Sequence, residues 1–184
     1  MATLAEKIDA ARGLLSEQLA EHGPGGLVCA FTGGKDSTLA LWLLRGVLAE
    51  AEAGPVRALS IDTGCKFPEV VAFRDGLAAE WGVDLTVVRP EVSLDGYPLA
   101  EDPVACCREL KVQPLKRAIR ELGVDVLVTG LRADEHASRA GLPALERRED
   151  PQHLRAHPLL EFTEMDVWAA ITQERLPHCG LYAE

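Results

Sequence analysis

The sequence lacks the features that would mark a membrane, secreted or zinc-binding protein. No apolar run approaches the roughly 18 residues that a membrane-spanning helix needs. The N-terminal segment, residues 1–22, mixes charged residues with leucine and alanine and does not form a signal peptide. The five cysteines include no C-x-x-C pair, so no zinc framework is indicated. We therefore expect a cytoplasmic protein with reduced thiols and no membrane partner.

Basic residues are also scarce. The chain has 19 Lys and Arg against 29 Asp and Glu, a net charge of −10. An acidic surface repels phosphate backbones, so nucleic acid is not an expected partner. Residues 105–155 are an exception, because basic residues slightly outnumber acidic ones there. This local excess suits a small anionic substrate, or it is simply the solvated surface of helices.

The chain length of 184 residues suits a single domain, residues 1–184, and is too short for two ordinary ones.

A capping box and helical apolar spacing predict a first helix over residues 3–22. Beyond it, short apolar strands alternate with helices, the strands at 27–31, 56–61, 85–88 and 124–129 and the helices at 37–47, 68–81, 111–122 and 163–173. This pattern predicts an α/β fold with a doubly wound, mostly parallel sheet of five or six strands and helices on both faces. Residues 91–106 and 133–155 lack clear periodicity, and we expect mobile loops there, over the site.

A turn containing two glycines, Thr32-Gly-Gly-Lys-Asp-Ser37, joins the first predicted strand to the following helix. The glycines allow positive φ and let backbone N–H groups approach an anion. The helix N-terminus adds its dipole, Lys35 a full charge and Ser37 a hydroxyl donor. The spacing is neither that of a Walker loop nor that of a G-x-G-x-x-G fingerprint. The turn therefore predicts a phosphate-binding loop of another kind.

This loop resembles the PP-loop, S-G-G-K-D-S, of ATP pyrophosphatases, and threonine at its first position keeps the hydroxyl. Further motifs follow in order at residues 62–69, 106–115, 130–132 with 138–139, and 157–168. Together they resemble the PAPS reductase family, the adenine nucleotide alpha hydrolase-like PP-loop proteins. That family includes adenylyl-sulfate and PAPS reductases, the small subunit of sulfate adenylyltransferase and FAD synthetases. The resemblance covers roughly residues 25–182.

The resemblance implies that ATP lays its β,γ-phosphates on the loop and exposes its α-phosphorus to an anionic, sulfur-related acceptor, with release of pyrophosphate. Reductases of the family have commonly lost the Gly-Lys-Asp-Ser part of the loop, so the intact loop favours ATP. Three alternatives stay open: a thiol- or thioredoxin-dependent adenylyl-sulfate or PAPS reductase whose C-terminal cysteines are missing from a truncated tail, an FMN adenylyltransferase, and a nucleotide-binding module that serves a partner subunit. The sulfate-activating branch implies a GTPase partner. A homodimer also stays open.

The resemblance also implies roles for individual residues. The expected ligands of the nucleotide, whether ATP, adenylyl sulfate or PAPS, are Ala30, Phe31, Thr32, Gly33, Gly34, Lys35, Asp36, Ser37, Gly130 and Arg139. The expected catalytic residues are Lys35, Asp62, Lys66 and Arg132. The resemblance implies that Lys66 faces the acceptor anion, and that Lys111 serves the same anion. It also implies that the guanidinium groups of Arg132 and Arg139 bind this anion bidentately.

Two kinds of metal site are expected. Mg²⁺ binds through one or two carboxylates plus phosphate oxygens, and Asp36 and Asp62 are its candidate ligands. Cys106 and Cys107 resemble the cysteine pair that holds a [4Fe–4S] cluster in adenylyl-sulfate reductases, with Cys179 as a candidate third ligand. The alternative is that these cysteines are ordinary buried or loop thiols.

Overall fold

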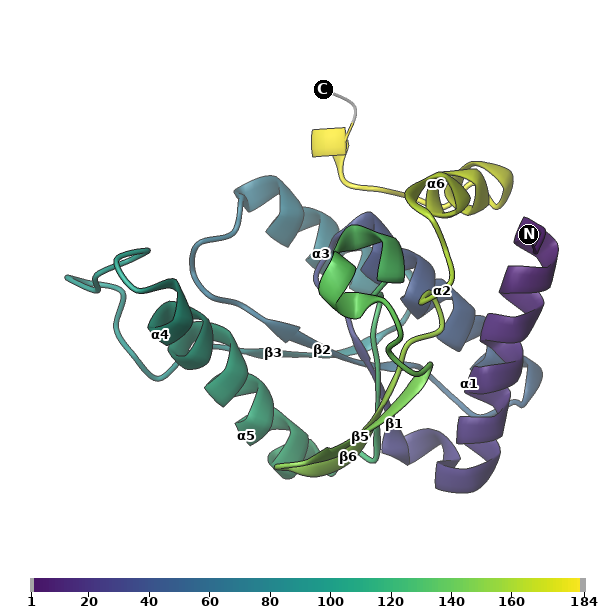
Figure 1. The fold of residues 1–184 in the computed structure, drawn as a ribbon, viewed down its shortest axis with the longest axis horizontal. Coiled ribbons are helices and arrows are strands. Elements are labelled where there is room, and N and C mark those ends of the chain that lie inside the picture. The colour runs from purple at the N-terminus through teal and green to yellow at the C-terminus, as the bar shows by residue number, and fades with distance from the viewer. Residues whose placement is uncertain (1, 183–184) are drawn as a thin grey trace.

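A computed structural model describes residues 2–182 and contains a six-stranded sheet flanked by helices (Figure 1). The helices are α1 Leu4–Gly26, α2 Lys35–Glu50, α3 Pro68–Glu80, α4 Pro103–Cys107, α5 Gln113–Leu122 and α6 Glu164–Gln173. The strands are β1 Leu27–Ala30, β2 Arg57–Ile61, β3 Asp84–Val88, β4 Val126–Val128, β5 Leu145–Glu149 and β6 Gln152–Ala156. A π-helical turn, Arg108–Val112, joins α4 to α5, so this helical segment starts earlier than the predicted residue 111.

The strand order is β3-β2-β1-β4-β6-β5, and every neighbouring pair is parallel except β5 with β6. The expected doubly wound, mostly parallel sheet is confirmed. From β1 the chain moves through β2 to β3 at one edge, and from β4 it moves to the other edge. The strand order therefore reverses between β1 and β4, and ligands bind beyond the carboxyl ends of strands at such a point.

Helices cover both faces of the sheet, as the sequence predicts (Figure 1). Leu27 and Cys29 of β1 pack in a core with α1, α2, α3 and α6 on one face. Val28, between them, points to the opposite face and packs with Ala118 and Ile119 of α5. Because both of their faces are buried, β1 and β4 are apolar at every position, which is the pattern that identified them.

The first helix begins as predicted, with a capping box. The Thr3 side chain accepts from the Glu6 amide, and the Glu6 carboxylate accepts from the Thr3 amide at 2.7 Å. The regular helix stops at Gly23, where φ is 70°, and a short turn containing Pro24 completes α1. This agrees with the predicted end near residue 22.

Residues 133–155 are not the loop that we expected. They contain two 3-10 turns, Ala133–Glu135 and Ala137–Arg139, then β5 and most of β6. β5 lies at the sheet edge and carries mostly charged, exposed residues, so it shows no apolar alternation by which the sequence could identify it. Residues 91–102 contain no helix or strand, and α4 follows them, capped by the side chain of Asp102. Within residues 2–182, no helix is long and apolar enough to cross a bilayer.

Candidate nucleotide-binding site

The predicted phosphate loop lies at the point where the strand order reverses. It joins β1 to α2, and Gly130 follows the neighbouring strand β4. A Cβ atom on Gly130 would lie 2.7 Å from the backbone carbon of Asp36. At Gly33, where φ is 86°, an added Cβ would lie 2.9 Å from the carbonyl oxygen of Val70 on α3. Backbone therefore packs directly on backbone here, and both positions require glycine.

The loop presents unpaired amides at the start of α2. Within residues 2–182, the N–H groups of Asp36 and Ser37 donate to no protein acceptor, and Gly34 provides no side-chain cap. The Ser37 hydroxyl, which was expected to donate to a ligand, is hydrogen-bonded within the loop. It donates to the Gly34 carbonyl at 2.8 Å and lies 3.2 Å from the Thr32 amide nitrogen, so it braces the loop. The open amides and the helix dipole favour an anion at this position.

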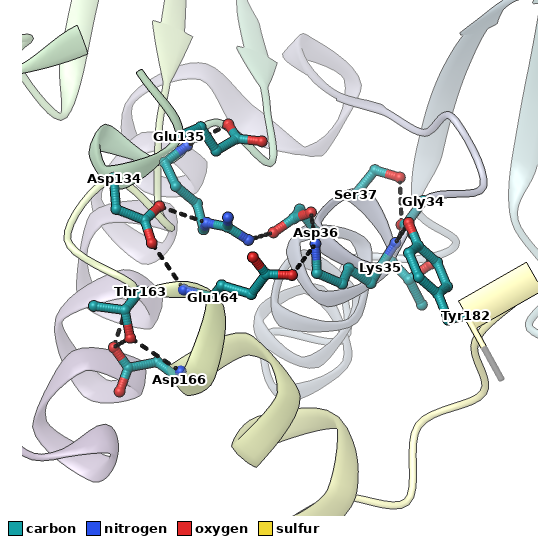
Figure 2. Close-up of polar contacts among 12 residues, drawn as sticks. Gly34, Lys35, Asp36, Ser37, Asp134, Glu135, Thr163, Glu164, Asp166 and Tyr182 are labelled. Atoms are coloured by element: carbon teal, nitrogen blue, oxygen red, sulfur yellow. Dashed lines mark hydrogen bonds and ion pairs between the residues drawn. The ribbon is translucent and has the colours of Figure 1, made fainter. Parts of the chain in front are cut away.

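One residue that the sequence did not single out contacts the loop. The Lys35 amide donates to the Tyr182 hydroxyl at 3.3 Å, and the Lys35 ammonium lies 5.6 Å from the centre of the Tyr182 ring (Figure 2). The same ring packs edge-on against Trp168 of α6, with centroids 5.4 Å apart. A tyrosine hydroxyl therefore accepts the hydrogen bond of an amide in the predicted phosphate loop.

A network of charged side chains surrounds the first turn of α2 (Figure 2). The Lys35 ammonium lies 3.0 Å from the Asp36 carboxylate and 3.5 Å from that of Glu164. Arg132, which follows β4, pairs with Asp36 and, at 2.9 Å, with Asp134. Burial disfavours both charged groups, but the acidic neighbours outweigh burial and raise the pKa of Lys35 and of Arg132. Both cations are therefore charged and already paired.

Arg132 and Arg139, which were predicted to grip an acceptor anion, are both paired with carboxylates of the chain. Arg132 is only 3% exposed, and its guanidinium group faces Asp36 and Asp134. Arg139 pairs with Glu135. A buried guanidinium needs carboxylate partners to offset desolvation, and the Arg-x-Asp-Glu segment supplies them locally.

A cavity of about 890 Å³ lies beside the loop and takes in the ends of β1 and β2. Its walls are mostly apolar, and they are formed by Ala30, Thr32, Leu59, Ile61, Thr63, Cys65, Lys66, Leu99, Ala100, Pro103, Cys106, Cys107, Leu110, Lys111, Val112 and Leu115. Phe31 is fully buried in the core, and its amide donates to Leu59 within the sheet, so its side chain is not available to a base. The cavity provides an apolar space next to a phosphate loop, as a nucleoside requires.

Asp62 follows β2 and is ionised. One of its carboxylate oxygens accepts from the Gly64 amide at 3.1 Å, and the other lies 3.6 Å from Arg89. The Gly64 hydrogen bond, together with nearby cations, lowers the pKa of Asp62 in spite of partial burial. The other predicted magnesium ligand, Asp36, already contacts two cations through its two oxygens.

The three cysteines proposed for an iron–sulfur cluster are not brought together. Cys106 and Cys107 line the cavity, whereas Cys179 is buried and does not line it. Figure 1 shows α4 well apart from the segment after α6 that carries Cys179. Among residues 2–182, no group of three or more His, Cys, Asp or Glu side chains is arranged to hold a metal ion. These residues do not fit a cluster.

A glycine loop with open amides, at the switch point of a parallel sheet and beside an apolar cavity, is the arrangement that nucleotide-binding α/β proteins use. Residues 26–184 match the phosphoadenosine phosphosulfate reductase domain, and the chain belongs to that family. The resemblance drawn from the sequence motifs is confirmed.

The chain is also similar to individual proteins of this family. The chain is 35% identical to sulfate adenylyltransferase subunit 2 of Xanthomonas oryzae pv. oryzae, in an alignment 180 positions long that covers 84% of this chain and 59% of that relative. The chain thus spans about three-fifths of the length of the relative.

Solved structures share the fold. Phosphoadenylyl-sulfate reductase from Candida auris, in a phosphate complex, has a TM-score of 0.76 and 22% identity, over 100% of this chain and 92% of that one. Candida glabrata FMN adenylyltransferase, in complex with FMN and the ATP analog AMPCPP, has a TM-score of 0.80 and 18% identity, over 97% and 60%. At these identities the likeness is one of fold.

Proposed function

We propose that this chain binds ATP and transfers its adenylyl group to sulfate, with release of pyrophosphate. The observation that carries the proposal is the intact phosphate loop, whose open amides and buried Lys35 suit the tail of a nucleoside triphosphate. The relatives named sulfate adenylyltransferase subunit 2 support sulfate as the acceptor.

In the proposed reaction the loop amides and Lys35 hold the β- and γ-phosphates, and the adenosine lies in the adjacent cavity. A sulfate oxygen attacks the α-phosphorus and forms the new P–O bond. The bond from the α-phosphorus to the bridging oxygen breaks, and its electron pair leaves with pyrophosphate. Because sulfate is already an oxyanion, no general base is needed, and the protein contributes position and charge.

Mg²⁺ would neutralise charge on the phosphate oxygens in this reaction. Of the two predicted ligands, Asp62 fits this role, because it is ionised and partly buried. Within residues 2–182 one of its oxygens accepts a hydrogen bond from Gly64, and the other has only the exposed Arg89 nearby, at 3.6 Å. Asp36 fits less well, because it would have to give up Arg132 or Lys35.

We also infer that the chain works with a partner subunit. The relatives bear the name subunit 2, which implies an assembly with another subunit. If the chain belongs to the sulfate-activating branch, the resemblance implies that this subunit is a GTPase. In that case turnover depends on the partner, while nucleotide binding does not.

Pyrophosphate release from ATP, with sulfate, with FMN and without acceptor, tests the proposal on the full chain with and without its partner. We expect sulfate-dependent release that Lys35→Ala abolishes. Lys116→Ala is the matched control, because Lys116 pairs with Asp150 on α5 and does not line the cavity. Release with FMN but not with sulfate, or release unaffected by Lys35→Ala, would contradict the proposal.

A further inference from the structure

A second cavity, of about 420 Å³, lies at the end of the sheet opposite the phosphate loop. Its walls include Val56, which immediately precedes β2, whereas the loop follows the carboxyl end of the parallel strand β1. Arg45 of α2 also lines it, ten residues after Lys35 and therefore about 15 Å along the helix. The cavity is separate from the nucleotide site.

The polar side chains that line this second cavity are all hydrogen-bond donors. They are the guanidinium groups of Arg12 and Arg45 and the indole groups of Trp42 and Trp81, and the other lining residues are glycine, alanine, proline and valine. A guanidinium or indole N–H donates but does not accept. Among the described residues no acidic side chain lines the cavity, although the chain has 29 Asp and Glu and a net charge of −10. The lining therefore favours a ligand that brings acceptors and negative charge.

Only one of the two arginines has its charge available to such a ligand. Arg12 pairs with Glu50 and lies against Gly46, where an added Cβ atom would be 3.0 Å from an Arg12 guanidinium nitrogen. Arg45 is exposed, and within residues 2–182 it pairs with no carboxylate. Its guanidinium carbon lies 5.4 Å from the centre of the Trp81 ring. This contact holds the cation at the cavity without neutralising its charge.

The two tryptophans indicate the shape of the ligand. Trp42 and Arg45 are three residues apart on α2 and share one face of the helix, and Trp81 approaches from the end of α3. Both indole groups are half-buried and offer flat apolar surface. The edge of a guanidinium group matches the two oxygens of a carboxylate. The volume lies within the range of small-molecule sites.

We propose that this second cavity is a binding site for a small aromatic carboxylate. The carboxylate accepts hydrogen bonds from Arg45, and the aromatic ring packs against the indole groups of Trp42 and Trp81. The proposal goes beyond adenylyl transfer and does not depend on it, because the cavity shares no residue with the nucleotide site.

NMR of the ¹⁵N-labelled chain tests the site with benzoate as the probe. The chain has three tryptophans, so three indole N–H signals report binding, and a Trp→Phe variant of each assigns them. We expect benzoate to shift the signals of Trp42 and Trp81. The signal of Trp168, which packs against Tyr182 beside the phosphate loop, should not move. Benzamide has a similar planar shape without the charge, and it should bind at least about fivefold more weakly.

The Arg45→Gln variant tests the role of the guanidinium group. Because Arg45 is exposed, the variant should fold, and it should weaken benzoate binding at least about fivefold. Arg147→Gln is the matched control, because Arg147 is an exposed arginine of β5 that does not line the cavity. It should leave benzoate binding unchanged.

Four results would overturn the proposal: equal binding of benzamide and benzoate, equal shifts at Trp168, benzoate binding unaffected by Arg45→Gln, or the absence of benzoate binding. If benzoate does not bind but Arg45→Gln weakens association with the partner subunit, the cavity belongs to a protein interface. Failure of the chain to bind AMPCPP would count against the proposed function alone, since the benzoate shifts at Trp42 and Trp81 would remain.

Discussion

Replacing Tyr182 with phenylalanine tests whether the phosphate loop must release an internal partner before it binds ATP. The Tyr182 hydroxyl accepts from the Lys35 amide at 3.3 Å, where a phosphate oxygen would bind. A neutral hydrogen bond contributes about 0.5–1.5 kcal/mol net, and this one is long, so the lower half of that range applies. Its loss should tighten binding of ATP and pyrophosphate about two- to fivefold. The phenylalanine ring keeps the packing on Trp168 and under Lys35.

Titration calorimetry with ATP, pyrophosphate and AMP measures this effect. AMP lacks the β- and γ-phosphates that would contact the loop, so its affinity should not change. Tyr97→Phe is the matched control, because it removes a hydroxyl that donates to Glu109 at 2.9 Å and not to the loop. Weaker pyrophosphate binding by the Tyr182→Phe variant would refute the reasoning, since the hydroxyl would then assist the ligand instead of competing with it.

Three further predictions concern stability and reactivity. The hydrogen bond from Lys7 is the main reason that the pKa of Asp166 is lowered to about 2. The ionised carboxylate therefore stabilises the fold fully above about pH 4, and this contribution is lost as the pH falls through 2. Urea unfolding should show Asp166→Asn costing about 1–2 kcal/mol at pH 7 and progressively less in acid. Gly130→Ala should displace the loop backbone, cost about 1–3 kcal/mol and abolish ATP binding, whereas Gly13→Ala, with open space around it, should not destabilise. Burial raises the pKa of Cys29 to about 12, so iodoacetamide should alkylate it only after unfolding, as mass spectrometry would show.

The central part of the fold could be predicted because its strands are buried on both faces. β1 and β4 are short apolar runs and β2 is mostly apolar, and each is bounded by a recognisable turn or helix. β5 could not be predicted, because an edge strand such as Leu145–Glu149 is held by backbone pairing with β6 and needs few apolar side chains. The prediction of a mobile loop over 133–155 failed for this reason.

The phosphate loop could be predicted because its function is local in the chain. Glycines, Lys35 and the helix start follow one another within a few residues, and each has a direct physical role. The partners of the loop could not be predicted. Tyr182 contacts Lys35 across 147 residues of sequence, and Arg132 reaches Asp36 across 96, so only the folded chain shows which charges are already neutralised.

The charged outer strand also limits how copies of this chain can associate. β5 exposes Arg147, Arg148 and Glu149 along an edge whose backbone groups could otherwise pair with another strand. Arg148 is partly committed to Glu146 on the same strand, at 2.9 Å. A second molecule that extended the sheet here would have to desolvate these charged side chains without providing an ion-pair partner for each of them. Growth of a continuous intermolecular sheet is therefore disfavoured at this border, and a homodimer would have to form through a different surface.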